Sequence, residues 1–566
     1  MTAASFAASL PERGAVAYLV LGLFSLCLFL PGISALPPVD RDEARFAQAS
    51  RQMVESGDYV NIRFQDKARH KKPAGVYWLQ AASVQVFGTI GSNQIWPYRV
   101  PSVLGALGAV LFLFAFARGP YGRRVAFFAA LMLAGSVVLT VEAHLGKADA
   151  VLLAAVVVAQ GALCRVYLRG TAGEPVALAT AIVFWAAQGA AILIKGPIGP
   201  LISALTIIAL IIAERRAAWL KGLRPLPGLV IAAAIAAPWF IAVSLETGGA
   251  FLADALGKDL LAKLISVQEG HGAPPGAYSL AMFVSFWPGS LLAFPALVWA
   301  WRHRADKRVR YCLAWLGPAW ILFELIPTKL PHYVLPLYPA LALICAHAAI
   351  SGADELARLS RTAVGRGLMA LWGAAGLAIG IGIGGVSWWL EGGVTVAGLV
   401  PAAGAIVAVA LGLWFAFRDR LVHAVTAATL GAAIVYASAL GIVLPAAENL
   451  WLSRTAALAV ARHGNGAAAA GAPVAVAGYG EPSIVFLLGT ATRLVSPDEA
   501  AKLLAETPGA LALIAKSHEA RFLEVSGNLG RRPDLLQTLS GLNYSRGRPV
   551  TLVLYGGGGR EPMGVR

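Results

Sequence analysis

Thirteen apolar runs of roughly membrane-spanning length divide this chain, and they constrain its fold more than any other feature. A helix needs about 20 apolar residues to cross a bilayer core, and each run is near that length. The 58% hydrophobic content and the mean hydropathy of +0.68 exclude an ordinary soluble protein. The sequence therefore predicts a polytopic α-helical membrane protein with about 13 transmembrane helices. The runs are 15–36, 97–117, 125–143, 149–168, 176–194, 197–213, 225–244, 280–300, 311–326, 334–350, 367–390, 395–416 and 422–446.

Loop charge predicts the orientation, because short cytoplasmic loops retain Lys and Arg. With the N-terminus inside, the inner loops hold twenty basic residues and the short outer loops hold five. An odd number of spans then places the C-terminus outside. The net charge of +16 is explained by attraction of these loops to anionic lipid and gives no indication of nucleic acid.

Three regions escape the apolar runs and are expected on the outer side: 37–96, 245–279 and 447–566. The predicted domains are a membrane domain over 1–446 and an outer α/β domain over 447–566. Within the first loop, Glu43 to Glu55 and Gly75 to Phe87 are expected to form helices at the membrane surface.

The tail alternates short β-type runs with charged stretches, which is typical of a small α/β domain. The expected strands are 474–477, 483–488, 511–515 and 550–554, and the expected helices are 497–506, 517–526 and 533–540.

The first loop concentrates charge in a chain that is only 13% charged. Fourteen of the thirty-three residues from Asp40 to Lys72 are Asp, Glu, Lys or Arg. Acids at one end and cations at the other suit a reaction with a phosphate leaving group. Phosphate-loop, HExxH, GxSxG and strand-linked GxGxxG motifs are missing, so nucleotide chemistry has no visible site. The four cysteines lie in apolar runs without metal spacing and are interpreted as core residues.

Several motifs occur in a characteristic order: PVDRDEARFAQASRQMVESGDYV, HKKPAGVYWLQ, KADA, TKLPHYVLPLYPAL and, in the tail, GYGEPSIVFLLG. Together they resemble the bacterial superfamily of protein O-mannosyltransferases and aminoarabinose lipid A transferases (ArnT-like). The resemblance implies a GT-C fold. It also implies transfer of a sugar from a polyprenyl (undecaprenyl) phosphate to a lipid A, glycan or protein acceptor at the periplasmic face of the inner membrane.

The resemblance also implies roles for individual residues. Asp42 occupies the family's Asp-Glu position with Glu43, and it would activate or orient the acceptor together with Asp149. The expected supporting residues are Arg45, Lys71 and His271. The donor phosphate would be bound by residues of the Lys-Pro and TKLPHY motifs, namely Lys72, Lys329, His332 and Tyr333.

Structural interpretations of these residues stay open. Asp42 precedes a predicted helix and can cap it, while Arg45 can pair with Asp42 or Glu43. Asp149 can form a local pair with Lys147 or His144. Lys71 and Lys72 can contact lipid headgroups, and Lys195 can snorkel toward the membrane surface.

One departure from the family pattern bears on cofactors. The aminoarabinose transferases have Glu-Lys-Pro where this chain has Lys71-Lys72-Pro73. Glu269 and His271 resemble the family's Glu-His region, but the arginine that follows in the family is missing. Glu269 and His271 are the candidate ligands for a divalent metal, the one cofactor considered, although the missing arginine and glutamate argue against this site.

A rival hypothesis from another class is a secondary transporter or flippase of lipid-linked sugars, since many spans with few charges also describe transporters. A non-catalytic membrane scaffold is a further alternative. Charges gathered at one face favour an enzyme. Its expected partners are a polyprenyl-phosphate sugar, a lipid or glycan acceptor and membrane lipids, with no nucleic acid.

Overall fold

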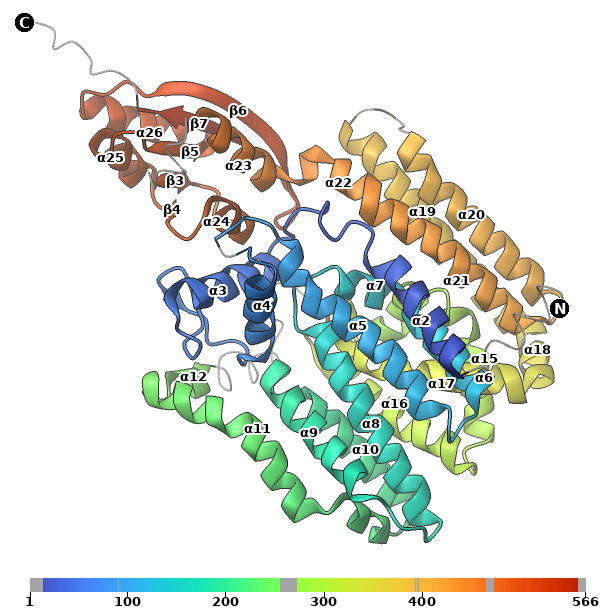
Figure 1. Ribbon diagram of the computed structural model, residues 1–566. Helices are drawn as coiled ribbons and strands as arrows, with labels where there is room; N and C mark the ends of the chain where they lie inside the picture. Colours follow the sequence, from blue (N-terminus) through green and yellow to red (C-terminus); the bar gives the residue numbers. More distant parts are fainter. Residues whose placement is uncertain are drawn as a thin grey trace, which may run out of the picture.

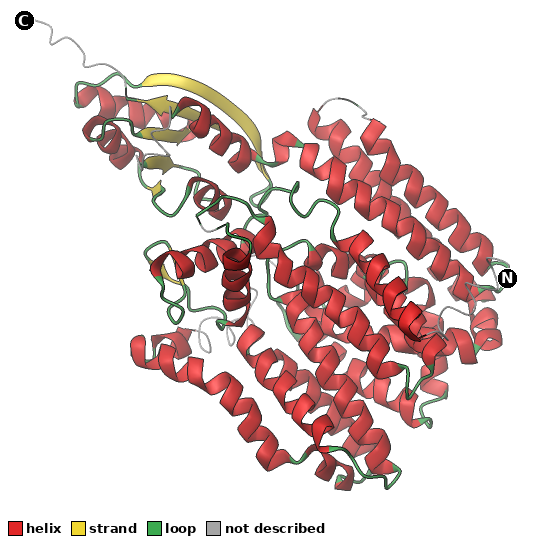
Figure 2. Ribbon diagram, in the orientation of Figure 1, coloured by secondary structure: helices red, strands yellow, loops and turns green. Residues whose placement is uncertain are grey.

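The computed structural model describes residues 14–89, 91–254, 272–391, 393, 396–464 and 473–557, and most of them are helical (Figure 2). A long helical region begins at α2 (Gly14–Phe29) and ends at α22 (Leu444–Ala446), and a smaller α/β domain follows it (Figure 1). Large apolar side chains cover the outside of the helical region; Ile212, Val230 and Ile321 are 71%, 67% and 62% exposed. Such a surface suits lipid, where each backbone polar group is satisfied inside a helix.

Eight helices of the described residues are long and apolar enough to cross a membrane, or up to nine if a bent pair counts as one span. The chain is thus a multi-pass membrane protein. The bent pair is α6 (Arg123–Ala134) and α7 (Val137–Ala143), which meet at 62° where one continuous run, 125–143, is expected from the sequence. The eight spans are α5 (Trp96–Ala117), α8 (Asp149–Thr171), α9 (Leu178–Lys195), α11 (Pro225–Glu246), η4 with α17 (Pro331–Ser351), Ala363–Val386 of α19, α20 (Val396–Ala416) and α21 through α22 (Leu421–Ala446).

The other helices of this region are shorter or more polar. Three expected runs are met here by α2, by α10 and by the pair α14 and α15, each of fewer than 18 residues. Besides α2, the shorter or more polar helices are α10 (Ile198–Glu214), η2 (Ala218–Leu223), α12 (Ala250–Leu252), α14 (Ala277–Ser285), α15 (Ser290–Arg302), α16 (Lys307–Leu325), α18 (Ala353–Arg361) and the π-helical turn η5 (Ala439–Val443). Four further elements form parts of the spans above: η4 (Pro331–Leu337), α17 (Tyr338–Ser351), α19 (Ala363–Glu391) and α21 (Leu421–Ser438).

The first loop contains two helices, as expected, joined by a two-stranded hairpin. They are α3 (Asp42–Ser56) and α4 (Gly75–Val86), with β1 (Arg63–Phe64) and β2 (Lys67–Ala68) between them. Gly57 ends α3 in the left-handed conformation at φ 70°, which glycine adopts without steric cost. The apolar face of α3 is buried against protein, since the rings of Phe46 and Tyr77 stack at 5.0 Å.

The C-terminal domain is a five-stranded mixed sheet with helices on both faces. The strand order is β4-β3-β5-β7-β6; β3 is parallel to β4 and β5, and β7 is antiparallel to β5 and β6. After η6 (Glu448–Leu450), its elements are α23 (Leu452–His463), β3 (Val474–Ala477), α24 (Pro482–Leu488), β4 (Arg493–Leu494), α25 (Pro497–Glu506), β5 (Leu511–Ala515), α26 (Lys516–Asn528), β6 (Asp534–Asn543) and β7 (Arg548–Gly556).

Two expectations for this domain are wrong. Residues 483–488 form helix α24 instead of a strand, because Pro482 starts a helix well and a short apolar run does not by itself distinguish the two structures. Within the expected helix 533–540, residues 534–540 belong to the edge strand β6, because pairing with β7 across a hairpin overrides local propensity.

The C-terminal domain packs onto the first loop (Figure 1). Phe486 of α24 is buried in a cluster with Ala47 of α3, Val84 of α4 and Tyr98 of α5. Asp40 adds polar contacts, because its carboxylate accepts hydrogen bonds from the backbone N–H and the hydroxyl of Ser483, both at 2.7 Å. The domain is therefore held directly above the charged loop.

Candidate active site

A cavity of about 440 Å³ lies where the first loop, three membrane helices and the C-terminal domain meet. The start of α3, the start of α8, the end of α9 and the start of η4 all reach it, so one end of the helical region forms its wall. The polar lining residues are Asp40, Arg41, Asp42, Glu43, Arg45, Arg69, Lys71, Lys72, Lys147, Asp149, Lys195, Thr328, His332, Tyr333, Tyr544 and Ser545.

Asp42 is the first residue of α3 and is exposed onto this cavity. It does not cap the helix, whose N-cap residue is Arg41, and α3 has no side-chain cap among the described residues. Burial in the site opposes ionisation, but Lys147, Arg69 and Arg45 outweigh it and lower the pKa of Asp42. The carboxylate is therefore ionised at neutral pH and able to accept a proton.

Glu43 is buried and fully engaged, so the expected catalytic role does not fit its geometry. Its carboxylate accepts from Arg99 Nε at 2.8 Å and Arg99 Nη2 at 2.9 Å. The backbone N–H groups of Gly146 and Val39 donate to the same two oxygens at 2.7 and 2.8 Å. Glu43 thus fixes the loop that precedes Asp42 and leaves no oxygen for a substrate.

Asp149 forms an ion pair with Lys195, which lies at the end of α9. This long-range pair replaces the local pair with Lys147 or His144 that the sequence leaves open. Lys195 also lies 5.5 Å from the centre of the Tyr333 ring, so it is a wall residue of the site and does not snorkel away from it.

Lys147 pairs with Glu142 at 3.0 Å and reaches the cavity from the loop between α7 and α8. Its pKa is raised: burial alone would lower it, but Glu142 and Asp149 more than compensate. His332 bridges the two acids, with Nδ1 3.5 Å from Glu142 and Nε2 3.9 Å from Asp149. These contacts hold Lys147, His332 and the two acids in fixed positions beside the cavity.

Three further cations come from the segment before α4. Arg69 is buried, with Nε donating to the Tyr77 hydroxyl at 3.1 Å and its guanidinium 5.1 Å from the Phe46 ring. Lys71 is exposed and Lys72 half-buried, and both line the cavity. Arg45 also lines it, and no ion pair of Arg45 within 4 Å occurs in the described ranges.

Lys329 is the exception among the expected donor-binding residues. It is absent from the lining, and its Nζ donates to the carbonyls of Ala273 and Ile326, each at 2.8 Å. The neighbouring His332 and Tyr333 do reach the cavity. Lys329 therefore holds the chain before η4.

The candidate metal ligands are not placed. Glu269 and His271 lie outside the described residues. Among the residues that are described, no group of three His, Cys, Asp or Glu side chains could hold a metal ion.

Several site residues were not singled out from the sequence. Lys147 carried a weak signal, since it precedes Asp149 by two residues in the KADA motif. Tyr544 and Ser545 carried none, because they lie some 500 residues from Asp40 and Arg41. The Tyr544 hydroxyl accepts from the Asp40 N–H at 2.7 Å, and Arg41 donates to the Ser545 carbonyl at 2.6 Å.

Comparison with known families identifies related sequences. A family model described as dolichyl-phosphate-mannose-protein mannosyltransferase matches residues 71–241. The undecaprenyl phosphate-alpha-4-amino-4-deoxy-L-arabinose arabinosyl transferase of Aeromonas salmonicida is 29% identical over 58% of this chain and 59% of its own length. A second such transferase, from Pseudomonas fluorescens, is 28% identical over the same shares. The chain therefore covers about three fifths of these relatives.

Solved structures show the fold. ArnT from Cupriavidus metallidurans, in a crystal structure bound to undecaprenyl phosphate, matches with a TM-score of 0.70 at 20% identity, covering 95% of this chain and 97% of that one. The oligosaccharyltransferase AglB from Archaeoglobus fulgidus matches at 0.53 and 11% identity, covering 98% and 74%. The chain thus shares the helical membrane fold of these two structures, and the relatives above confirm its resemblance to the aminoarabinose transferases.

Proposed function

We propose that this protein is a glycosyltransferase that moves a sugar from a polyprenyl (undecaprenyl) phosphate donor to a lipid A, glycan or protein acceptor. The observation that carries the proposal is the composition of the cavity. Seven Lys and Arg side chains line it against four acids, and the ionised Asp42 faces into it. An excess of cations suits an anionic leaving group, and the ionised carboxylate suits an acceptor with a proton to lose.

In the proposed reaction, the bond between the anomeric carbon of the sugar and the phosphate oxygen breaks, and both electrons leave with the polyprenyl phosphate. The acceptor oxygen forms the new bond to that carbon, and its proton passes to Asp42. Lys72, with Arg69 and Lys71 beside it, stabilises the charge that develops on the phosphate. A phosphate acceptor would already be ionised and would need no base.

Residues at the end of α9 and in η4 position the reactants. Tyr333 and His332 reach the cavity from η4, and Lys195 lies against the Tyr333 ring. The Asp149–Lys195 pair neutralises two charges at the ends of membrane helices, where a charge without a partner is costly. We assign these residues to holding the donor headgroup beside Asp42.

The undecaprenyl phosphate bound in the ArnT crystal structure supports a donor of that class for this chain. The named relatives support transfer of a pentose, whereas Lys71 in place of the family's glutamate argues for a different sugar or acceptor. The donor panel described below identifies the sugar that is transferred.

The proposal also includes the placement of the chain. The expected domains, 1–446 in the membrane and 447–566 in the periplasm, fit a cavity formed by one end of the helices and the C-terminal domain. Thirteen spans in a bacterial inner membrane would put the N-terminus in the cytoplasm and this cavity at the periplasmic face.

The alternative, a secondary transporter or flippase, has less support, because the named relatives are transferases. A panel of labelled undecaprenyl-phosphate sugars, offered to the purified protein with envelope lipids, glycans and proteins, tests the proposal. We expect one donor to label one acceptor class. Movement of lipid-linked sugars across vesicles without any labelled product would favour the transporter.

A further inference from the structure

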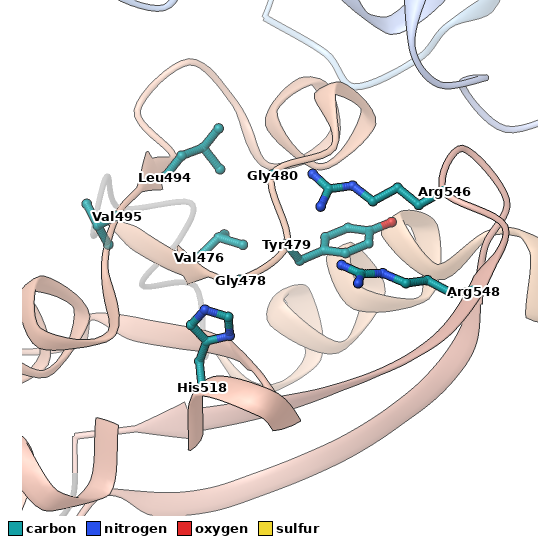
Figure 3. A pocket seen from close by; sticks show the side chains of 9 residues that line it. All are labelled: Val476, Gly478, Tyr479, Gly480, Leu494, Val495, His518, Arg546 and Arg548. Atoms are coloured by element: carbon teal, nitrogen blue, oxygen red, sulfur yellow. The ribbon is translucent and has the colours of Figure 1, made fainter. Parts of the chain in front are cut away.

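A second cavity, of about 420 Å³, lies within the C-terminal domain itself (Figure 3). None of its lining residues belongs to the cavity described above. Val476, Leu494 and Val495 form an apolar side, and the side chains of Arg546 and Arg548 reach in from the opposite side. The cavity thus combines an apolar wall with a cationic one.

The place of this cavity in the sheet is characteristic of ligand sites in α/β domains. Strands β3 and β5 are parallel neighbours. The chain leaves β3 toward α24, whose Val485 shares a buried cluster with Val476 on one face of the sheet. It leaves β5 toward α26, whose Phe522 shares a second cluster with Ala512 on the other face. Connections that leave adjacent parallel strands to opposite faces open a crevice at the carboxyl ends, where such folds bind ligands.

The cationic wall comes from the β6–β7 hairpin. Arg548 makes no ion pair within 4 Å in the part of the chain that the structure describes. Arg546 lies with Nε 3.4 Å from Glu481 Oε1, an oxygen that also accepts from Asn543 Nδ2 at 2.8 Å. Two guanidinium groups against one carboxylate leave the wall positive, and guanidinium groups match phosphate oxygens in geometry.

Two glycines after β3 keep the cavity open. Gly478 has φ +81°, and a Cβ there would lie 2.7 Å from both Ala515 Cβ and His518 Nδ1, so a side chain would displace His518. A Cβ added at Gly480 would meet nothing within 4 Å. Gly480 is therefore a position where a side chain can fill the cavity without clashing with the protein.

We propose that this cavity is a second binding site, which takes a phosphorylated saccharide. The volume falls within the range of about 300–1,000 Å³ that small-molecule sites occupy. Arg548 and Arg546 bind the phosphate, His518 contributes a polar group, and the apolar side packs against the sugar ring. The same ligand chemistry occurs in a soluble phosphosugar and in a phosphorylated glycolipid headgroup.

The hairpin that carries the arginines also reaches the first cavity. Tyr544 and Ser545 line that cavity, and Arg546 and Arg548 follow them within four residues. A ligand on the arginines would therefore contact the same turn that receives Asp40 and Arg41.

The test measures binding by the full chain, so its result is independent of the transferase proposal. In the first arm, glucosamine 1-phosphate is titrated calorimetrically into detergent-solubilised protein. In the second arm, binding of lipid A is measured for the protein in nanodiscs, and nanodiscs without lipid A serve as the blank. Arg548→Ala and Gly480→Leu are compared with Lys502→Ala, which removes an exposed charge from α25 outside the cavity.

We expect Arg548→Ala to weaken binding about ten- to a hundredfold, the loss typical of a charged hydrogen bond. Gly480→Leu should weaken binding by a similar factor because its side chain occupies the cavity, while Lys502→Ala stays within twofold. An effect on the soluble sugar identifies a soluble ligand, and an effect confined to lipid A nanodiscs identifies a headgroup. Equal binding by all variants in both arms, or no binding by the wild type in either, overturns the proposal.

Discussion

Arg99 donates two hydrogen bonds to the carboxylate of Glu43, joining the start of α5 to the start of α3 deep inside the protein. The remaining Arg99 N–H groups donate to the carbonyls of Ile33, Leu36 and Pro37 between 2.7 and 2.9 Å. One buried pair therefore ties the end of the first helical segment, the charged loop and a membrane helix together. Asp42 is placed by the residue that follows it.

Removing Glu43 should therefore destabilise the protein strongly. We expect Glu43→Ala to cost about 3–5 kcal/mol, because it leaves the Arg99 guanidinium buried without its carboxylate. Thermal unfolding in detergent measures the change. Glu55→Ala is the control, since its pair with Arg51 is partly exposed and should contribute about 0–1 kcal/mol. Equal losses for the two variants would contradict the positioning role.

Lys72 and Lys329 should behave differently although both belong to the expected donor-binding set. Lys72→Ala should weaken binding of undecaprenyl phosphate about ten- to a hundredfold, because Lys72 lines the cavity. Lys329→Ala should leave that affinity within twofold and lower stability by about 1–3 kcal/mol, because two carbonyls lose their donor. Binding of undecaprenyl phosphate and thermal unfolding are measured on both variants. A larger loss of affinity in Lys329→Ala than in Lys72→Ala would refute the assignment.

Variants of the Asp149–Lys195 pair distinguish a structural role of the pair from a role in sugar transfer. Lys195→Ala should destabilise the protein by about 3–5 kcal/mol, since it leaves the buried Asp149 carboxylate without its lysine partner. The double variant Asp149→Asn with Lys195→Met should recover most of that stability yet remain inactive in sugar transfer. Recovery of transfer along with stability would show that the pair is purely structural.

Asp40 should make stability depend on pH. Burial raises its pKa to about 6, with Glu481 adding to the shift and with Ser483 and Arg45 opposing it. The unfolded carboxyl has a pKa of about 3.9. Between about pH 4 and pH 6 the folded protein binds more protons than the unfolded one, so this contribution is present below pH 4 and is lost as pH rises through 6.

Asp40→Asn is the matching variant, because an amide can keep both contacts with Ser483. We expect the difference in unfolding temperature between pH 5 and pH 7 to shrink in Asp40→Asn relative to the wild type. An unchanged difference would assign the pH dependence to other groups.

The sequence predicted the charged loop, its two helices and most of the site, because each of these has a local signal. Asp42, Lys72 and His332 stand out as charged or polar residues beside apolar runs. The structure places all three at one cavity, as expected for residues on the same side of the membrane. The tail contains a five-stranded mixed sheet and helices, and one of these helices, α25, carries a capping box at Ser496 and Glu499 that is visible in the sequence.

What the sequence could not show depends on long-range contacts. Lys195 looks like an ordinary helix-end lysine until Asp149 is placed beside it. Glu43 and Asp42 are adjacent and equally acidic, and only the position of Arg99 separates a buried anchor from a residue that faces the cavity. Strand β6 lacks the local pattern of a strand because its partner β7 supplies the pairing.

Asp42 removes the acceptor proton in the proposed reaction, and a comparison of the transfer rate with donor affinity in one preparation tests this role. Asp42→Asn should lower the transfer rate about a hundred- to ten-thousandfold while donor affinity and unfolding temperature stay near wild type. Asp66→Asn, in the β1–β2 turn outside the cavity lining, should be fully active. An undiminished transfer rate in Asp42→Asn would show that Asp42 does not remove a proton from the acceptor.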